Sequence, residues 1–393
     1  MARVRLKKGE EKRLVAGHPW VYQTEIEEIY GVFEPGDIVE VEDSRGKFIG
    51  LGYINPASMI TVRLLTHQRN EEINEEFWRR RLSVAWNYRQ RILQGLDTDS
   101  CRVVFGEADF IPGFIVDKFG SYLVVQSLAL GIDRWQETLV KILDELIKPA
   151  GIYERNDAAV RELEGLELRK GFLKGDFDTT VVIRENGLRF YVDLAQGQKT
   201  GYFLDQRENR AAIKPLVEEG RVLDCFCHTG GFSIHAAHYG AREVLGIDIS
   251  EKAVELARNN AALNGYQNIC SFVAANAFDA LRELERSGER FDVVILDPPA
   301  FVKSKKAIEG ALRGYKEINL RAMKILNKGG FLVTCSCSYH LSEDLFVQTI
   351  ASAARDARRR LRLVARRGQA ADHPILFGYD ESFYLKCLIV QVI

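Results

Sequence analysis

The sequence predicts an α/β protein whose C-terminal half is a doubly wound, Rossmann-like sheet preceded by two smaller domains. After residue 191, buried runs rich in β-branched residues alternate with amphipathic helices, which is typical of a mostly parallel sheet. Before residue 70 the chain shows short strands separated by turn residues. The stretch between them mixes helices and strands. The predicted domains are residues 1–70 (β), 71–190 (small α+β) and 191–393 (Rossmann-like).

The first domain is predicted to be a small β structure. In residues 38–42, apolar and acidic side chains alternate at the strand period, and Ser44-Arg45-Gly46 follows as a turn. Residues 48–53 return as a strand, and residues 59–65 form another. Only the tight turns and the alternation support this interpretation.

The middle domain begins with a predicted helix over residues 71–92, whose faces are rich in Glu and Arg. Short apolar runs then predict strands, and one amphipathic stretch predicts a second helix. The strands are placed at 103–105, 113–118, 122–127, near 151–154 and at 181–193, and the helix at 135–147.

The third domain repeats the order strand, then helix. Its strands are predicted at 221–224, 243–248, 271–274, 291–296, 331–335 and 383–392. Its helices are predicted at 232–239, 251–264, 278–287, 307–326 and 343–359. Since successive strands are separated by a helix, they are expected to lie parallel in one sheet.

Composition narrows the class of protein. The 393 residues are 46% hydrophobic and 28% charged with a net charge of −1, so the bulk charge would not draw the chain onto a polyanion. The first fourteen residues contain no apolar signal region, and no apolar run reaches the length of a membrane span, which predicts a cytoplasmic protein. The seven cysteines include two C-x-C pairs and lack zinc-site spacing, so no metal site is predicted.

A ligand site is predicted where the first strand of the third domain ends. Asp224 closes that strand, and the turn after it carries Gly230-Gly231, which allows a ligand to approach the backbone. The turn lacks both the G-x-G-x-x-G pattern and the lysine of a P-loop, which argues against dinucleotides and nucleoside triphosphates. S-adenosylmethionine (SAM) carries no phosphate, so a site for it needs neither feature.

Acids at successive strand ends fit the parts of SAM. Asp224 can lie near the ammonium of the methionine moiety, and Asp248, at the end of the next strand, can accept hydrogen bonds from the ribose hydroxyls. Asn276 follows the third strand and can face the adenine edge, flanked by Ile249 and Phe278. A single acid at the end of a strand often only caps the helix that follows. Polar residues at the ends of three successive strands, Asp224, Asp248 and Asn276, together predict a SAM site.

The fourth and fifth strands end in residues suited to chemistry on a base. Asp297-Pro298-Pro299-Ala300-Phe301 forms a rigid turn that can grip a planar base by an amino group or ring nitrogen. Thr334-Cys335-Ser336-Cys337-Ser338 ends the next strand. Carbon 5 of cytosine becomes nucleophilic only after a thiolate adds to carbon 6, so a cysteine beside the cofactor favours that reaction. Either cysteine taken alone could instead be a buried structural thiol.

These motifs carry a resemblance to a known family. Residues 224–233, 296–301 and 334–338 look like those of the RlmI-type family, class I SAM-dependent methyltransferases acting on cytosine carbon 5 of large-subunit (23S) ribosomal RNA. The stretch 198–210 is the most specific of the signatures, and the resemblance covers essentially the whole chain. It implies that residues 1–70 form an RNA-binding PUA domain.

The resemblance also implies which residues act. In the wider RNA cytosine-5 methyltransferases the nucleophile is followed by Ser, four residues and an acid. Cys337, with Ser338 and Glu343, fits that spacing and Cys335 does not, so Cys337 is the predicted nucleophile and Asp297 its catalytic partner. The residues predicted to bind the cofactor are Lys199, Phe203, Asp205, Asp224, Phe226, Gly230, Asp248, Ile249, Asn276, Ala277 and Asp297.

Two positions depart from the family pattern. Many relatives carry a second cysteine after the double proline, thought to aid enzyme release, where this chain has Ala300. Release would then need another group, for which Cys335 is a candidate. Asn276 stands where an acid is common, which is expected to weaken the grip on adenine.

Contact with ribosomal RNA is expected through local basic residues. Of these, the lysines just beyond the double proline are the best candidates for phosphate contacts, because they lie where the substrate must enter. The basic clusters are Arg3, Arg5, Lys7, Lys8, Lys12 and Arg13; Lys303, Lys305 and Lys306; and residues 355–367. A target base must be unstacked or single-stranded to reach a thiol.

Two other functions remain open from sequence. One is methylation of a different RNA atom such as guanine N7, because a related branch shares the Asp-Pro-Pro-x-Phe motif but typically lacks the cysteine. The other is an RNA-binding ribosome assembly factor without catalysis. The oligomeric state is also open, with a homodimer among the alternatives.

Overall fold

The computed structural model describes residues 1–301 and 308–393. Its contacts divide the chain into two compact units, which are described separately. The first comprises Met1–Arg184, Val192–Leu204 and Ala371–Ser382, and the second Glu185–Tyr191, Asp205–Ala370 and Phe383–Ile393. The predicted domain boundaries at 70 and 190 stay predictions.

The N-terminal part of the first unit is a six-stranded sheet of order β2-β6-β5-β4-β1-β3. Its neighbouring strands pair antiparallel except β1 and β4, which are parallel. A cluster of buried aliphatic side chains forms its core. The elements are β1 (Arg3–Leu6), α1 (Glu11–Val15), β2 (Trp20–Tyr22), β3 (Ile26–Tyr30), β4 (Ile38–Glu42), β5 (Phe48–Ile54) and β6 (Ile60–Thr66).

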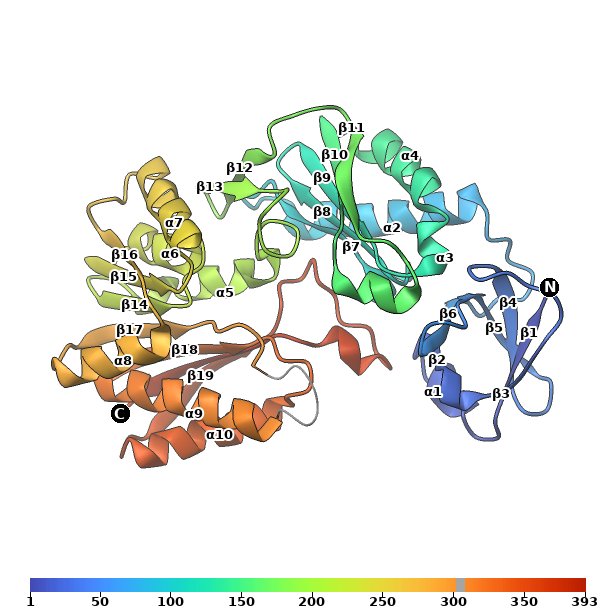
Figure 1. The fold of residues 1–393 in the computed structure, drawn as a ribbon. Helices are drawn as coiled ribbons and strands as arrows, with labels where there is room; N and C mark the ends of the chain where they lie inside the picture. The colour runs from blue at the N-terminus through green and yellow to red at the C-terminus, as the bar shows by residue number, and fades with distance from the viewer. Residues whose placement is uncertain (302–307) are drawn as a thin grey trace. The chain divides into compact units, whose positions relative to one another are not determined.

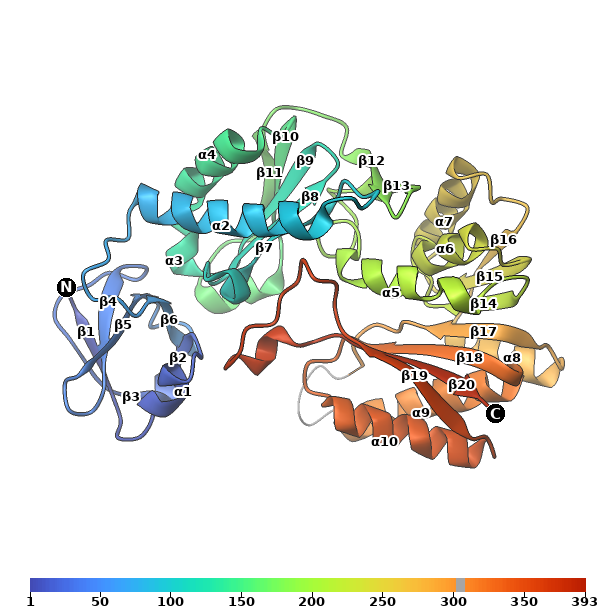
Figure 2. The same cartoon turned by 180° about the vertical axis from the view of Figure 1, so that it is seen from behind.

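The rest of the first unit is built on a five-stranded sheet of order β11-β10-β9-β8-β7. Helix α2 packs against α4 and against β7, and Figure 2 shows this helix running across the sheet. The elements are α2 (Glu75–Leu93), β7 (Cys101–Phe105), β8 (Phe114–Phe119), β9 (Tyr122–Ser127), α3 (Leu130–Asp133), α4 (Gln136–Ile147), β10 (Gly151–Asn156) and β11 (Arg169–Lys174).

A two-stranded hairpin follows, formed by β12 (Thr180–Glu185) and β13 (Leu188–Asp193). The sequence predicts strand throughout 181–193, but Asn186 and Gly187 both have positive φ (50° and 82°) and reverse the chain. An Asn-Gly pair with positive φ is the preferred two-residue connection between antiparallel strands.

The second unit contains a seven-stranded sheet of order β16-β15-β14-β17-β18-β20-β19. Strands β14 to β18 pair parallel, whereas β20 is antiparallel to both β18 and β19. Since β14 lies between β15 and β17, the strand order reverses there, and such a switch point opens a ligand crevice at the carboxyl ends of the strands. The strands are β14 (Arg221–Cys225), β15 (Glu243–Asp248), β16 (Cys270–Ala274), β17 (Phe291–Leu296), β18 (Leu326–Ser336), β19 (Leu361–Arg367) and β20 (Lys386–Val392).

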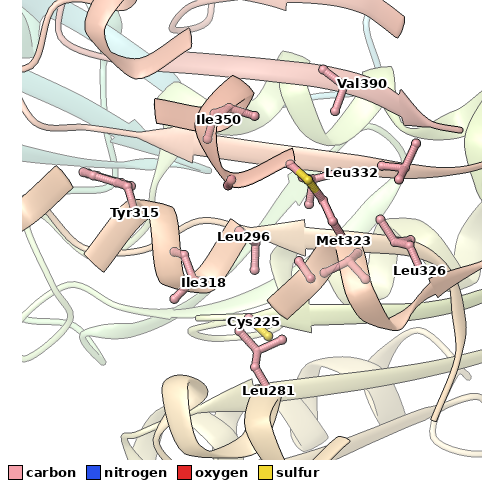
Figure 3. Close-up of a cluster of buried hydrophobic side chains, with 14 of the residues drawn as sticks. Cys225, Leu281, Leu296, Tyr315, Ile318, Met323, Leu326, Leu332, Ile350 and Val390 are labelled. Atoms are coloured by element: carbon pink, nitrogen blue, oxygen red, sulfur yellow. The ribbon is translucent and has the colours of Figure 1, made fainter. Parts of the chain in front are cut away.

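Helices cover both faces of this sheet (Figure 1). Helices α8, α9 and α10 bury a shared apolar core against one face, where Figure 3 shows Leu281, Tyr315 and Met323 among sheet residues such as Leu296 and Leu332. Helix α6 packs on β14 and β15. The helices are α5 (Arg207–Ala212), α6 (Gly231–His238), α7 (Glu251–Leu263), α8 (Ala277–Arg286), α9 (Ile308–Ile325) and α10 (Glu343–Asp356). Within the described ranges, every helix is too short or too polar to cross a membrane.

Candidate cofactor and catalytic site

The site lies at the carboxyl edge of the seven-stranded sheet. Parallel pairing sets Asp224 of β14 opposite Gly246 of β15 and Ile295 of β17, and sets Leu296 opposite Thr334 of β18. The residues that follow these strands therefore emerge at one edge, although they are far apart in the chain. Asp224, Asp248, Asp297 and Cys337 all come from this edge, as the sequence predicts.

The loop after β14 is held in an unusual backbone conformation. Phe226, His228 and Gly230 all have positive φ, at 65°, 49° and 83°. The loop is tied to the neighbouring strand, because the N–H of Cys227 donates to the carbonyl of Ile247 at 3.0 Å. A Cβ on Gly230 would come within 3.2 Å of three side chains, so glycine suits both the φ and the close packing here.

Asp224 is fully buried at the end of β14. Its Oδ2 accepts hydrogen bonds from the backbone N–H of Ser233 at 3.0 Å and from the Ser233 hydroxyl at 2.6 Å. Its Oδ1 is buried and, among the described residues, receives no hydrogen bond. Burial raises the pKa of Asp224 to about 7 although the Ser233 hydrogen bonds oppose that shift. A buried oxygen of this kind is suited to an ammonium ligand.

Asp248 is oriented by the backbone on both sides. Its Oδ2 accepts from the N–H of His228 at 2.9 Å and its Oδ1 from the N–H of Ser250 at 3.0 Å. Each carboxylate oxygen has a further lone pair, so the pair of ribose hydroxyls can still be recognised. The next residue, Ile249, presents a side chain that is 74% exposed and can cover one face of an adenine ring.

Asn276 caps helix α8, with its Oδ1 accepting from the N–H of Phe278 at 2.9 Å. This is the helix-capping role common for such residues, and the second lone pair of the oxygen remains for a base edge. Ala277 is buried as the first residue of the helix, where a backbone N–H has no acceptor within the helix. The rings of Phe226 and Phe301 lie 6.5 and 5.9 Å from that of Phe278, forming an apolar wall beside the cap.

These residues fit SAM. The buried Oδ1 of Asp224 matches the ammonium, the fixed carboxylate of Asp248 matches the ribose, and the N-terminus of α8 with its aromatic neighbours matches adenine. Because SAM has no phosphate, the site needs no lysine to neutralise one, and the turn after β14 contains no P-loop lysine.

Asp297 is positioned by a residue that the sequence did not single out. Nε2 of Gln206 donates to Oδ1 of Asp297 at 3.0 Å, and Oε1 of Gln206 accepts from Asn209 at 2.7 Å. The neighbouring Asp205 accepts a 2.6 Å hydrogen bond from the hydroxyl of Tyr384. The stretch that carries the most specific resemblance therefore orients the carboxylate of the double-proline turn.

Two predicted cofactor residues belong to the other unit. Lys199 has a left-handed φ of 53°, and its ammonium lies 4.6 Å from the centroid of the Phe203 ring. Both are in the segment Val192–Leu204 of the first unit, so their part in cofactor binding stays a prediction.

Cys337 is half-buried just beyond β18, with its Sγ 3.9 Å from the carbonyl oxygen of Pro298. The thiol therefore lies beside the residue that follows Asp297. A buried hydroxyl network fixes the turn around it, because the Tyr315 hydroxyl lies 2.8 Å from that of Ser336 and 3.0 Å from that of Ser338.

Cys335 has a different environment. It is fully buried, and it lies opposite Cys387 in the register of the neighbouring strands β18 and β20. A hydrogen bond with Cys387, together with burial, raises the pKa of Cys335 well above its usual value. These are the properties of an unreactive structural thiol, which argues against a part in product release.

The predicted basic clusters divide into two groups. Many of the described arginines are engaged within their own unit: Arg5 pairs with Glu42 at 2.8 Å, Arg13 with Glu25 at 2.6 Å, and Arg367 donates to Asn209 at 2.9 Å. Lys303, Lys305 and Lys306, the strongest candidates for phosphate contacts, lie outside the described residues.

Comparison with known proteins decides the family. Residues 167–390 match the model of an S-adenosylmethionine-dependent methyltransferase family, and residues 4–67 match that of a PUA-like domain. Ribosomal RNA large subunit methyltransferase I of Tolumonas auensis is 41% identical over 393 residues, covering 99% of each chain. The protein of the same name from Shigella dysenteriae is 40% identical and covers 100% of this chain and 99% of its own. The chain belongs to this methyltransferase family.

Solved structures support the fold of this methyltransferase. A putative SAM-dependent methyltransferase from Streptococcus mutans superimposes with a TM-score of 0.85 at 19% identity, covering 100% of both chains. A putative methyltransferase complexed with SAH superimposes with a TM-score of 0.87, again at 19% identity and full coverage. These structures confirm the predicted class I methyltransferase fold. The family models and the curated relatives confirm the N-terminal PUA-like domain, the SAM cofactor and the RlmI-type resemblance.

Proposed function

We propose that this methyltransferase forms 5-methylcytosine in large-subunit (23S) ribosomal RNA through a covalent bond between Cys337 and carbon 6 of the base. The ribosomal substrate is inferred from the names of the relatives. The observation that carries the cytosine chemistry is the position of the half-buried Cys337 thiol, 3.9 Å from the carbonyl of Pro298 and so beside the Asp297 turn.

In this reaction the Cys337 thiolate adds to carbon 6 of a flipped cytosine. Asp297, held by Gln206 and acting as the protonated acid, donates a hydrogen bond or proton at N3, which draws electron density into the ring as the sulfur–carbon bond forms. A proton transferred to N3 returns to Asp297 when the thiolate leaves. Bound SAM supplies the methyl group that carbon 5 receives. A base then removes the carbon 5 proton, and the electrons of that bond expel the Cys337 thiolate.

The chain also explains why a different base atom fits less well. An exocyclic or ring nitrogen is already nucleophilic, so methylation of guanine N7 needs no thiol at the site. In that case the buried Cys335 would be an ordinary structural thiol. The half-buried Cys337 beside the double-proline turn would have no chemical role.

The test is the variant Cys337→Ala with unmodified large-subunit ribosomal RNA from a strain lacking the enzyme. Methylation is expected to fall by at least about 10³-fold, the order lost when a covalent nucleophile is removed. Calorimetry is expected to show that the variant still binds SAM, because Cys337 is not among the residues that fit the cofactor.

The matched control is Cys335→Ala, which removes the other thiol of the same strand end. This variant is expected to keep carbon 5 methylation. Full activity in Cys337→Ala, or loss of activity only in Cys335→Ala, would reject Cys337 as the nucleophile.

A further inference from the structure

Lys386 is a lysine buried beside the catalytic turn. It begins β20 opposite Ser336 of β18, and only 3% of its surface is exposed. Its Nζ donates to the carbonyl of Ser338 at 3.0 Å and to that of Tyr384 at 3.2 Å. These bonds use two of the three ammonium donors, and burying such a cation is costly unless it also has an anionic partner.

Two groups of the described residues favour the charged form of Lys386. Burial lowers the pKa of Lys386 to about 8, and the two groups that oppose this shift are the thiol of Cys337 and the carboxylate of Glu343. Glu343 is at the start of α10, and the centroid of the Phe383 ring lies 5.7 Å from Nζ. The Cys337 thiolate would therefore be a principal partner for the buried charge.

The hydrogen bond to Ser338 gives Lys386 a second effect. Ser338 directly follows Cys337, so the ammonium holds the backbone at the point where the thiol is presented. The Tyr315 hydroxyl of α9 holds the same turn through the hydroxyls of Ser336 and Ser338. The turn is thus fixed from two elements, and only one of them brings a positive charge.

We propose that Lys386 is the positioning residue of the nucleophile, stabilising the Cys337 thiolate by its charge and fixing the Cys337 turn through the carbonyl of Ser338. This inference rests on the proposed function for its role in RNA methylation. The Cys337 proton leaves to solvent before the base is attacked, and Lys386, with a pKa of about 8, keeps its proton at pH 7. A cation beside a thiol favours the thiolate, which is the reactive form.

The experiment measures the rate at which iodoacetamide alkylates Cys337 between pH 5 and 10, read by mass spectrometry of the peptide. In the wild-type enzyme the profile is expected to rise with a midpoint below the ordinary thiol value of about 8.5. In Lys386→Met the midpoint is expected to rise by about one unit, so that alkylation at pH 7 slows about tenfold.

Two further variants separate charge from hydrogen bonding. Lys386→Gln keeps a donor for the Ser338 carbonyl but removes the charge, and is expected to behave like Lys386→Met. Lys386→Arg keeps the charge and is expected to stay near the wild-type profile. Overlapping profiles for wild type, Lys386→Gln and Lys386→Met would overturn the proposal. A wild-type midpoint at or above pH 9 would also overturn it, and that measurement does not depend on whether a variant folds.

Alkylation uses neither RNA nor SAM, so it separates this inference from the proposed function. If Lys386→Met shifts the profile but the modified nucleoside is not 5-methylcytosine, the lysine–thiolate pair stands and the proposed function fails. If 5-methylcytosine forms and the profiles overlap, the reverse holds.

Discussion

At the scale of single residues, Asp224 shows most clearly what the site is built to bind. One carboxylate oxygen is satisfied by Ser233, and the other is buried with no hydrogen bond from the described residues. Burying an ionised carboxylate in this way is costly, and burial raises the pKa of Asp224 to about 7. An ammonium group at Oδ1 would offset that cost.

This leads to a prediction about pH. A raised pKa means that the free enzyme carries a proton on Asp224 below about pH 7, whereas the complex with an ammonium ligand favours the ionised form. SAH binding is therefore expected to release a proton and to tighten as pH rises from 5.5 to 7.5. Calorimetry in two buffers of different ionisation enthalpy measures this release.

The matched variant is Asp224→Asn, which is close in size and cannot ionise. It is expected to bind SAH more weakly and without proton release in that pH range. Equal proton release in wild type and variant would mean that another group titrates and that Asp224 does not hold the ammonium.

The position of a residue along the sheet could be predicted from sequence where that residue lies at or just beyond the end of a buried strand, although its role stays a prediction. Asp224, Asp248, Asp297 and Cys337 could be placed at one edge because parallel strands end together. Lys386 could not, since it is 48 residues from Ser338 in the chain and meets it only because β20 inserts antiparallel beside β18. The role of Gln206 likewise depends on a contact with a residue 91 positions away.

At the scale of elements, hydrophobic periodicity found most helices and buried strands of the second unit. It failed where charged residues lie in strands at sheet edges. Strand β19 (Leu361–Arg367) was interpreted only as part of a basic cluster, yet it pairs with β20 as the outer strand of the sheet. Charged side chains protect such edges from unwanted pairing, so they mask the strand pattern. Strands β3 and β11, each the outer strand of its sheet, were missed for the same reason.

The close packing of β15 gives a prediction about stability. A Cβ on Gly246 would lie 2.5 Å from Cδ1 of Phe272 and 3.1 Å from the sulfur of Cys227. Gly246→Ala is therefore expected to lower the free energy of unfolding by about 1–3 kcal/mol. Hydrogen exchange in peptides from β14 and β15 is the suitable measurement, because tryptophan fluorescence would report Trp20, Trp78, Trp86 and Trp135, all in the first unit.

The control for this variant is Gly310→Ala in α9. Among the described residues, a Cβ there meets only the end of the Arg313 side chain, at 3.8 Å, and alanine favours a helix over glycine by about 1 kcal/mol. Exchange is expected to be unchanged or slower in Gly310→Ala. Equal destabilisation by both variants would show that the effect is not due to packing at Gly246.

At the scale of the whole molecule, the proposed function requires a chain with a net charge of −1 to recognise RNA. Arginines near the N-terminus are engaged with acids of their own sheet, as in the pair of Arg3 with Glu40 at 3.4 Å. Specific placement of the base must therefore contribute more than bulk attraction. The sequence predicted the doubly wound sheet and a preceding β domain, because both depend on local patterns. The contacts between distant residues within each unit are not encoded in those patterns.

The central claim is that Cys337 forms a bond with cytosine during methylation. The most direct measurement incubates the enzyme and SAM with a ribosomal RNA fragment in which the target cytosine is replaced by 5-fluorocytosine, and resolves the products by denaturing electrophoresis and mass spectrometry. The fluorine cannot leave as the carbon 5 proton does, so a stable adduct on the peptide containing Cys337 is predicted for wild type and none for Cys337→Ala. Efficient methylation of the unmodified fragment with no adduct on the fluorinated one, or an adduct that persists in Cys337→Ala, would contradict the account.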